Sequence, residues 1–338
     1  MVADSLGRQL QSLRLSVTDR CNLRCAYCMP APSYVWLPRT EVLDFDELGR
    51  LVDVMVSLGV ARVRLTGGEP LLRNDLPTLI AMLADKPGIA DLALTTNGLL
   101  LQPKAQALRD AGLHRLTVSL DTLQPDRFHE LCRVDGLAKV LAGIEAARAA
   151  GFGPLKLDAV VIRDRNADEI LRLLEFAREA EAEMRFIEYM DVGGATEWTA
   201  DQAVGAAEIL ATIEQGLGPA RPIGERGAAP AARYELPDGQ VFGIVASNSA
   251  PFCGECTRCR LTADGMWYPC LYSDRGIDLK AALRSGATDG ELRSLLESRW
   301  TARRDRGAEQ RADDDSRSPL SRQDLAEDPH REMHTRGG

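Results

Sequence analysis

Cysteines are the residues of this sequence best suited to metal or redox chemistry, and seven of the eight fall into two groups. The first group lies in "CNLRCAYCMP", where Cys21, Cys25 and Cys28 have the spacing C-x3-C-x2-C. The second group lies in "FCGECTRCRLTADGMWYPC", which runs from Phe252 to Cys270. Thiols grouped in this way are typical of metal sites, catalytic sites or disulfides.

The first group has too few ligands for a structural zinc site. Such sites use four ligands, usually in two paired knuckles, whereas these three thiols have no local fourth partner. Iron–sulfur clusters also use cysteine thiolates and normally take four. Three thiolates around a four-iron cluster leave one iron open to a small molecule, much as catalytic zinc keeps an open position. The spacing therefore favours a cluster with an open iron.

In the second group, Cys253, Cys256 and Cys270 have the spacing C-x2-C-x13-C. A zinc ribbon that lacks or borrows a ligand is the simpler interpretation, and a second three-thiolate cluster is the alternative. Arg258 and Arg260 lie among these thiols, and guanidinium groups bind phosphate or carboxylate in a bidentate manner. We therefore expect an anionic ligand, although the two arginines also fit a solvated basic strand.

Cys259 and Cys132 lie outside these ligand sets. Cys259 extends the second group to CxxCxxC, which looks ferredoxin-like, and a fourth ligand there would close the cluster. In an extended segment its side chain points away from those of its two arginine neighbours, so we expect a buried, inert thiol. Cys132, in "FHELCRVDG", has no partner cysteine in the sequence and is predicted to be a buried or half-buried free thiol. The four histidines show no metal-ligand spacing.

Short β-rich runs alternate with amphipathic helical runs over the first two-thirds of the chain. The candidate strands are 13–17, 62–66, 91–95, 115–120, 155–162 and 184–190. Helical patterns between them include 45–59 and 167–182. Successive β–α units imply parallel strands with right-handed crossovers. We predict an α/β fold, an incomplete (βα)6 TIM-type barrel with a C-terminal extension that carries the second cluster; a doubly wound open sheet is the alternative.

Unusual polar residues follow the ends of these predicted strands. The first cysteine group follows the first strand, "GGEP" (67–70) the second and "TNG" (96–98) the third, and "SLD" (119–121) ends the fourth. In β/α barrels the chemistry takes place at the C-terminal ends of the strands. The sequence therefore places a site at this end of the barrel. Each motif also has a simpler interpretation, such as a turn at "GGEP" or a helix cap at Asp121.

We divide the chain into an N-terminal segment (1–11), a partial barrel (12–235), an auxiliary-cluster region (236–300) and a flexible tail (301–338). Gly, Ala and Pro accumulate between 192 and 232, and 241–247 is a candidate strand leading into the second cysteine group. Residues 301–332 are charge-dense and poor in apolar groups, so disorder is predicted there.

The 338-residue chain has a formal net charge of −9. Non-specific nucleic-acid binding favours a basic surface, so it is not expected. The N-terminus has no apolar run like that of a signal peptide, and no stretch approaches the roughly 20 apolar residues of a membrane span. We expect a cytoplasmic protein with no nucleic-acid or membrane partner, whose clustered thiols bind metal.

The motif C-x3-C-x-aromatic-C after an early strand resembles that of the radical S-adenosylmethionine (SAM) superfamily. "TGGEP" (66–70) resembles its segment for the SAM amino group, and "SLD" resembles its ribose-side contact. The resemblance implies that Cys21, Cys25 and Cys28 hold the cluster that cleaves SAM. The implied SAM contacts are Tyr27, Gly67, Gly68, Glu69, Ser119 and Met190.

Further segments resemble the GTP 3′,8-cyclase family, also called molybdenum cofactor biosynthesis protein A. They are "LRLSVTDRCNLRCAYCMP", "RLTGGEPLLR", "TTNG", "VSLDTL", "KLDAVV", "RFIEYMDVG", "FCGECTRCRLTADG" and the terminal "GG". The match spans residues 8–285 and the last two residues, while 192–240 and 301–332 carry no distinctive motif. Cys259 departs from the family, which usually has a small or aliphatic residue there.

This second resemblance implies roles for the remaining polar residues. Cys253, Cys256 and Cys270 would hold a second [4Fe-4S] cluster, whose open iron meets the guanine of GTP. The residues around GTP would be Arg14, Arg64, Thr95, Lys156, Arg258, Cys259 and Arg260. Catalysis would involve Arg258, Arg260 and the terminal Gly337 and Gly338. Cations inside strands fit this assignment, because a buried cation without an anionic partner is costly.

The implied reaction is a radical cyclisation that forms 3′,8-cyclo-7,8-dihydro-GTP. SAM cleavage yields a 5′-deoxyadenosyl radical, which removes the ribose 3′ hydrogen of GTP before the carbon radical attacks C8 of guanine. The implied partners are the next pathway enzyme (cyclic pyranopterin monophosphate synthase), a reductant protein and a second copy in a homodimer. The alternatives are another radical SAM enzyme with an auxiliary cluster, such as a peptide-modifying one, and a non-enzymatic zinc or iron–sulfur module.

Overall fold

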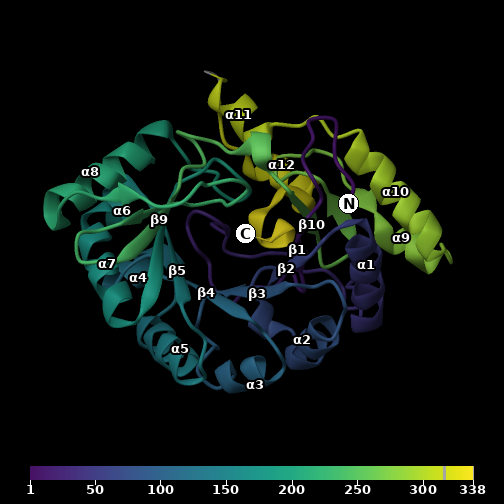
Figure 1. The fold of residues 1–338 in the computed structure, drawn as a ribbon, viewed down its shortest axis with the longest axis horizontal. Coiled ribbons are helices and arrows are strands. Elements are labelled where there is room, and N and C mark those ends of the chain that lie inside the picture. Colours follow the sequence, from purple (N-terminus) through teal and green to yellow (C-terminus); the bar gives the residue numbers. More distant parts are fainter. Residues whose placement is uncertain (315–316, 338) are drawn as a thin grey trace.

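A single curved sheet organises the molecule. The structure, a computed structural model, describes residues 1–314 and 317–337. The twelve strands have the order β12-β11-β10-β1-β2-β3-β4-β5-β6-β9-β8-β7. Helices cover the outer side of the curve, and the sheet does not close into a complete barrel (Figure 1). The predicted α/β class with an incomplete barrel is confirmed.

The six predicted strands are present, each within two residues of its expected bounds. They are β1 (Ser12–Ser16), β2 (Arg62–Thr66), β3 (Asp91–Thr96), β4 (Arg115–Ser119), β5 (Leu155–Val161) and β6 (Ala182–Glu188). The helices between and after them are α1 (Phe45–Leu58), α2 (Leu76–Ala84), α3 (Ala105–Asp110), α4 (Pro125–Cys132), α5 (Leu137–Ala149), α6 (Arg163–Asn166), α7 (Ile170–Glu179) and α8 (Ala206–Leu217).

The C-terminal part of the chain extends the same sheet at both edges. The additional strands are β7 (Arg221–Pro222), β8 (Ala232–Glu235), β9 (Val241–Val245), β10 (Arg258–Leu261), β11 (Met266–Tyr268) and β12 (Ile277–Asp278). β9 pairs in parallel with β6, and β10 pairs in parallel with β1. The parallel part of the sheet therefore has two strands more than six βα units supply. The predicted domain boundaries at 11/12, 235/236 and 300/301 remain predictions, and the sheet is continuous across the second.

Alternation along the strands separates a packed side from a polar side. In β1, Leu13 and Leu15 are buried in the hydrophobic core, while Arg14 between them lines a cavity. β2 repeats this pattern with Val63 and Leu65 around Arg64. Side chains on a strand alternate between its two faces, so the leucines pack under the helices and the arginines face the inside of the curve.

Helix α1 shows how local sequence sets the boundaries of the covering elements. Asp44 and Glu47 form a capping box at its N-terminus, and each side chain accepts a hydrogen bond from the other residue's backbone. Gly59 ends the helix in the left-handed conformation, with φ 120°. The sequence pattern over 45–59 thus predicts this helix correctly.

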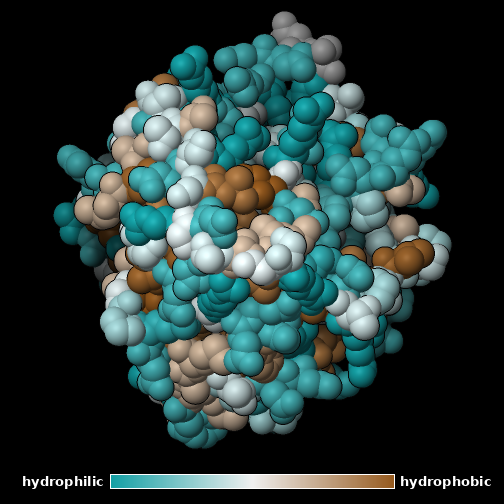
Figure 2. Space-filling view, turned by 90° about the vertical axis from the view of Figure 1, so that its right-hand side faces the viewer, coloured by the Kyte–Doolittle hydropathy of each residue, from teal (hydrophilic) through white to brown (hydrophobic). Residues whose placement is uncertain are grey.

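The last helices of the ordered core pack on the same side of the molecule as α1. These are α9 (Leu279–Arg284) and α10 (Asp289–Thr301). Leu292, Leu296 and Trp300 are the buried residues of α10. Arg50 pairs with Asp289 at 2.7 Å, joining α1 to α10. The outer surface of this face is largely hydrophilic, with hydrophobic residues in separate patches (Figure 2).

The segment after α10 differs from its predicted disorder. It contains α11 (Gly307–Ala312), α12 (Arg322–Glu327) and α13 (Met333–Arg336), and it enters the open side of the curved sheet (Figure 1). Arg311 and Arg317 form ion pairs with the buried Asp191, and His330 pairs with Asp264 at 2.6 Å. The prediction of disorder for 301–332 is thus wrong for the described residues, because composition does not reveal that the barrel supplies opposite charges.

No helix in the described ranges is long and apolar enough to cross a membrane.

Candidate active site

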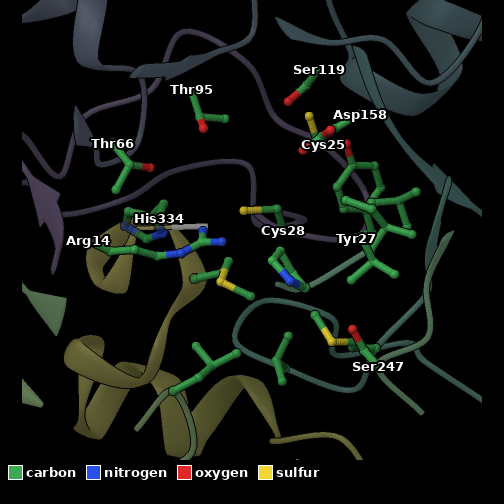
Figure 3. A pocket seen from close by; sticks show the side chains of 18 of the residues that line it. Arg14, Cys25, Tyr27, Cys28, Thr66, Thr95, Ser119, Asp158, Ser247 and His334 are labelled. Carbon is green, nitrogen blue, oxygen red and sulfur yellow. The ribbon is translucent and has the colours of Figure 1, made fainter. Parts of the chain in front are cut away.

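A cavity of about 380 Å³ lies inside the curve of the sheet. Figure 3 shows Thr95, Ser119 and Asp158, from three neighbouring strands, around it, together with Cys25 and Cys28 from the loop after β1. The thiols of both ligand sets, Cys21, Cys25 and Cys28 and Cys253, Cys256 and Cys270, line this one cavity. Two groups more than 200 residues apart in sequence are therefore brought to a single site.

The "GGEP" segment packs directly against the loop that carries the first thiols. A Cβ on Gly67 would lie 2.3 Å from the Thr18 carbonyl oxygen, and one on Gly68 would lie 2.3 Å from that of Arg20. The Gly68 amide donates to Thr18 and the Glu69 amide to Arg20, at 3.0 and 2.7 Å. Both glycines also line the cavity. Their small size thus allows close approach of the thiol loop as well as of a ligand.

Glu69 is fully buried and does not line the cavity within the described residues. Its carboxylate accepts hydrogen bonds from the Leu71 amide, the Thr96 hydroxyl and the Asn97 amide. Burial raises the pKa of Glu69 to about 7, although these donors act to lower it. In this arrangement the Glu69 side chain links "GGEP" to "TNG" through hydrogen bonds. Only the backbone of the "GGEP" segment is therefore available for the predicted cofactor contact.

The first thiols lie in a low-polarity environment. Burial raises the pKa of Cys21 to about 12 and that of Cys28 well above its usual value. A hydrogen bond with Cys132, followed by burial, raises the pKa of Cys25. Asn97 points its side-chain amide at Cys21 Sγ, 3.9 Å away. A raised pKa makes each thiolate less populated in the free protein, and binding to iron favours the thiolate form.

Other predicted cofactor contacts surround this loop. Tyr27, Ser119 and Met190 all line the cavity. The Tyr27 hydroxyl donates to Asp121, whose other oxygen accepts from the Val160 amide at 2.9 Å. Burial raises the pKa of Asp121 to about 6, against the effect of the Tyr27 hydrogen bond. Asp121 is therefore part of the cavity wall. The helix-cap interpretation is wrong, since the N-cap position of α4 is Gln124, three residues later.

Asp158 and Arg185 are cavity residues that the sequence analysis did not identify. They form a two-pronged ion pair between β5 and β6, with hydrogen bonds of 2.7 and 2.8 Å. Inward alternation within each strand could have indicated them, because Asp158 shares the face of Val160. Ser247, Tyr272 and His334 also line the cavity, and no sequence signal pointed to them.

Three arginines form a row across neighbouring strands. In the parallel register Arg14 of β1 lies beside Arg260 of β10 on one side and Arg64 of β2 on the other. Adjacent strands are about 4.8 Å apart, so like charges stand close together on the cavity wall. Burial, and then the charges of Arg260, Arg258 and Arg64, lower the pKa of Arg14 well below its usual value. Burial likewise lowers the pKa of Arg64 and of Arg260 to about 10.

Among the described residues, the carboxylate of Asp158 acts to raise the pKa of Arg14 and of Arg64, but it already forms an ion pair with Arg185. Arg64 donates to the hydroxyls of Thr95 and Thr117 at 3.0 and 3.1 Å. Arg258 stacks over Phe252, with 4.5 Å between the guanidinium carbon and the ring centroid. Neutral hydroxyls and an aromatic face do not cancel several buried positive charges. The row is suited to a polyanion.

Arg258 also shapes the electrostatics of the second thiol group. Burial acts to raise the pKa of Cys256, but Arg258 and Arg303 lower it to about 7. Burial raises the pKa of Cys270 to about 11 and also raises that of Cys253. At least one thiol of this set is therefore readily ionised, as a metal ligand must be.

Lys156 and Cys259 do not line the cavity within the described ranges. Lys156 lies 3.4 Å from Glu183, whose other oxygen accepts from Arg233 at 2.8 Å. A protein carboxylate thus pairs with Lys156, and the argument that its charge needs a bound triphosphate is wrong. Cys259 is fully buried in the hydrophobic core. Its predicted orientation away from the arginines is confirmed, and this position leaves it remote from the predicted substrate contact.

The chain terminus reaches the same wall of the cavity. The Arg260 guanidinium donates to the carbonyls of Arg336 and Gly337. Gly337 adopts φ 76°, and a Cβ there would lie 2.3 Å from Thr66 Cγ2. A larger residue would require the Thr66 side chain to move and would adopt an unfavourable left-handed backbone conformation, so this position favours glycine. Gly338 lies outside the described residues.

The thiols fit iron–sulfur clusters better than mononuclear zinc. Within residues 1–314 and 317–337, no group of three or more histidine, cysteine or carboxylate side chains is close enough to hold one metal ion. A four-iron cluster binds each thiolate through a different iron, so its ligands need not converge on one point. All six thiols line the cavity, so both sets are available as ligands of such clusters.

Comparisons with known proteins agree with this geometry. Residues 15–177 match the Radical SAM superfamily model, and residues 182–309 match Molybdenum Cofactor Synthesis C. GTP 3′,8-cyclase 3 of Mycobacterium bovis is 51% identical, with 100% of this chain and 90% of that protein covered. GTP 3′,8-cyclase of Acidothermus cellulolyticus is 48% identical over 98% of this chain and 95% of that protein.

The fold is also similar to that of a solved structure. Streptococcus suis SuiB bound to precursor peptide SuiA has a TM-score of 0.61 at 17% identity, covering 89% of this chain and 66% of that one. At this identity the likeness concerns the fold alone. The full-length sequence matches are decisive: the chain belongs to the GTP 3′,8-cyclase family of the radical SAM superfamily.

Proposed function

We propose that this protein is a radical SAM GTP 3′,8-cyclase, which converts GTP to 3′,8-cyclo-7,8-dihydro-GTP in the first step of molybdenum cofactor biosynthesis. The observation that carries the proposal is the in-register row of Arg260, Arg14 and Arg64 between two thiol groups in one cavity. A triphosphate supplies several negative charges that can offset such a row.

The thiol loop after β1 forms the SAM side of the proposed site. Cys21, Cys25 and Cys28 would hold a [4Fe-4S] cluster, which supplies reductive cleavage of SAM when bound. Tyr27, Ser119 and Met190 line the cavity beside these thiols. The Tyr27–Asp121 hydrogen bond fixes the ring against β5, so the tyrosine is positioned before a ligand arrives.

The opposite wall forms the GTP side. Cys253, Cys256 and Cys270 would hold a second [4Fe-4S] cluster, with guanine at its open iron. Arg14, Arg64, Arg258 and Arg260 would surround GTP and offset the charge of its triphosphate. Thr95, which accepts a hydrogen bond from Arg64, would lie beside them. Positioning both reactants in one cavity lowers the entropic cost of their encounter. The Gly337 carbonyl accepts a hydrogen bond from Arg260 at this wall.

Partners follow from the same assignment. The product would pass to cyclic pyranopterin monophosphate synthase, and a reductant protein would deliver electrons to the first cluster. We also propose a homodimer on the strength of the family, and a cytoplasmic location.

The test is an anaerobic assay of the reconstituted, reduced protein. SAM is supplied with GTP, with ATP or alone, and 5′-deoxyadenosine is measured. We expect its formation to depend on GTP, because the guanine side of the cavity must be filled before SAM is cleaved productively. Equal formation without GTP would reject the cyclase assignment and would favour another radical SAM reaction.

A further inference from the structure

Cys132 is a buried thiol that neither proposed ligand set uses. It is the last residue of α4 and is 4% exposed. Its Sγ lies 3.8 Å from that of Cys25, although the two residues are 107 positions apart in sequence. Both residues line the large cavity, and Cys25 is partly exposed, so a small molecule that enters the cavity can reach the Cys25 thiol.

Backbone contacts hold the two cysteines side by side. The Arg24 amide donates to the Cys132 carbonyl at 3.0 Å, and the Ala26 amide donates to the Leu131 carbonyl at 2.9 Å. These bonds flank Cys25 on both sides. None of them involves a thiol, so the juxtaposition of Cys25 with the end of α4 does not depend on a bound metal.

A third contact closes this arrangement. Arg133 follows α4 in the left-handed conformation, with φ 58°, which is uncommon for a large side chain. Its guanidinium donates to the Pro30 carbonyl at 2.9 Å, beyond the last thiol of the first group. The end of α4 is thus attached to the thiol loop before and after Cys25.

We propose that Cys25 and Cys132 form a reversible oxidation site in the cluster-free chain. The sulfurs must approach from 3.8 Å to the disulfide distance of about 2.05 Å. Rotation of the two side chains can supply a shift of this size, because the flanking hydrogen bonds already bring the backbones together.

The oxidant is a low-molecular-weight disulfide such as oxidised glutathione. One protein thiolate attacks it, forms a mixed disulfide and releases one glutathione thiolate; the second protein thiol then displaces the other glutathione. One sulfur–sulfur bond forms and one breaks. The two protein thiols lose two electrons, and the two glutathiones gain them together with two protons.

The consequence rests on the proposed cluster role of Cys25. A crosslinked Cys25 cannot ligate iron, so the oxidised chain does not load its first cluster until a thiol reductant opens the bond. The same bond keeps Cys25 from irreversible oxidation to a sulfinic acid. Cys132 therefore protects the ligand that lies nearest to it.

Peptide mapping tests the proposal on the full-length, cluster-free protein. The protein is treated anaerobically with oxidised glutathione, alkylated and digested with trypsin. Cleavage after arginine places Cys21, Cys25 and Cys132 in three different peptides, 21–24, 25–39 and 128–133. We expect peptide 25–39 to be joined to 128–133 through Cys25, with Cys28 alkylated. Recovery of alkylated Cys132, with Cys25 joined to Cys21 or Cys28, would overturn the proposal.

Two variants and an iron count complete the test. Cys132→Ser should abolish the crosslink, whereas Cys28→Ser, its matched control, should retain it; loss in both variants would reject the specific pairing. Oxidised wild-type protein should then take up about half of the iron of reduced protein, with recovery after dithiothreitol, if each of two clusters holds four irons. A crosslinked chain that loads fully would instead reject the cluster role of Cys25, which is part of the proposed function.

Discussion

The two thiol groups share one cavity but differ in their electrostatic surroundings. Burial or thiol contact raises the pKa values of Cys21, Cys25 and Cys28. In the second group Arg258 and Arg303 lower the pKa of Cys256 to about 7 against burial. The first site thus suits a cofactor that brings its own positive charge, as the SAM sulfonium does. The second suits an anionic substrate, because the protein itself provides the positive charge.

Replacing one thiol group at a time is the strongest test of this difference between the two groups. Replacing Cys21, Cys25 and Cys28 with Ala should abolish 5′-deoxyadenosine formation. Replacing Cys253, Cys256 and Cys270 should abolish the cyclised product while some SAM cleavage remains. Each triple variant should lose about half of the iron, since each set would hold one of two four-iron clusters. Iron and sulfide counts with product chromatography measure the effects, and identical losses of SAM cleavage would contradict the division of roles.

The arginine row offers the next largest effect. Arg14→Met should weaken GTP binding about 10- to 100-fold, the cost of losing a charge-assisted hydrogen bond. It should not lower the stability of the ligand-free protein, because burial and neighbouring cations already disfavour the Arg14 charge. Anaerobic calorimetry and denaturant unfolding measure the two quantities.

Arg62→Ala is the matched control for that variant. Arg62 lies on β2 two residues before Arg64, but it is exposed and donates to Gln11 at the outer end of the strand. GTP binding should be unchanged in Arg62→Ala. A loss of stability without a loss of affinity in Arg14→Met would show that Arg14 serves packing rather than the substrate.

Replacement of Cys259 tests whether the second cluster has three thiolate ligands or four. Cys259→Ala should leave the iron content unchanged and should lower the free energy of unfolding by about 1 kcal/mol, since a small buried side chain is truncated. Cys256→Ala is the control that should lose iron. Loss of the second cluster in Cys259→Ala would show that Cys259 is a ligand and that the cluster is closed.

Local patterns predict the individual strands and motifs, but not the contacts between distant segments. Alternation in β1 and β2 places Arg14 and Arg64 on one face. That Arg260 completes their row depends on the pairing of β1 with β10, which no local pattern reveals. The Glu183 partner of Lys156 comes likewise from the next strand.

The same limit explains the tail and Cys132. Residues 301–332 have the composition of a disordered segment, but in its described part Arg311, Arg317 and His330 pair with Asp191 and Asp264 of the barrel. Cys132 has no partner in the sequence, and only the packing of α4 against the thiol loop brings it to Cys25. In both cases the structure depends on residues that are distant in the sequence.

The smallest expected effect is a dependence on pH of the stability of the tail around His330. The Asp264 hydrogen bond raises the pKa of His330, so this contribution is complete below the ordinary histidine pKa of about 6.5 and is lost as pH rises through the raised value. His330 and Thr262 lower the pKa of Asp264 against burial, so its contribution is lost only at acid pH, as the pH falls through the lowered value.

Raising the pH from 6 to 9 should therefore lower the free energy of local unfolding of the tail by about 1 kcal/mol. Hydrogen exchange of residues 329–337, corrected for its intrinsic pH dependence, measures the change. The His330→Gln variant should show a flatter profile. Equal pH profiles in both proteins would assign the effect to another group.

Transfer of a labelled hydrogen tests the central claim most directly, namely that one cavity brings SAM and the GTP ribose together. Reduced, reconstituted protein is incubated anaerobically with SAM and GTP deuterated at ribose C3′, and 5′-deoxyadenosine is analysed by mass spectrometry. The proposed arrangement predicts one deuterium in 5′-deoxyadenosine and a cyclised product that lacks it. Unlabelled 5′-deoxyadenosine, formed while GTP keeps its deuterium, would contradict the account.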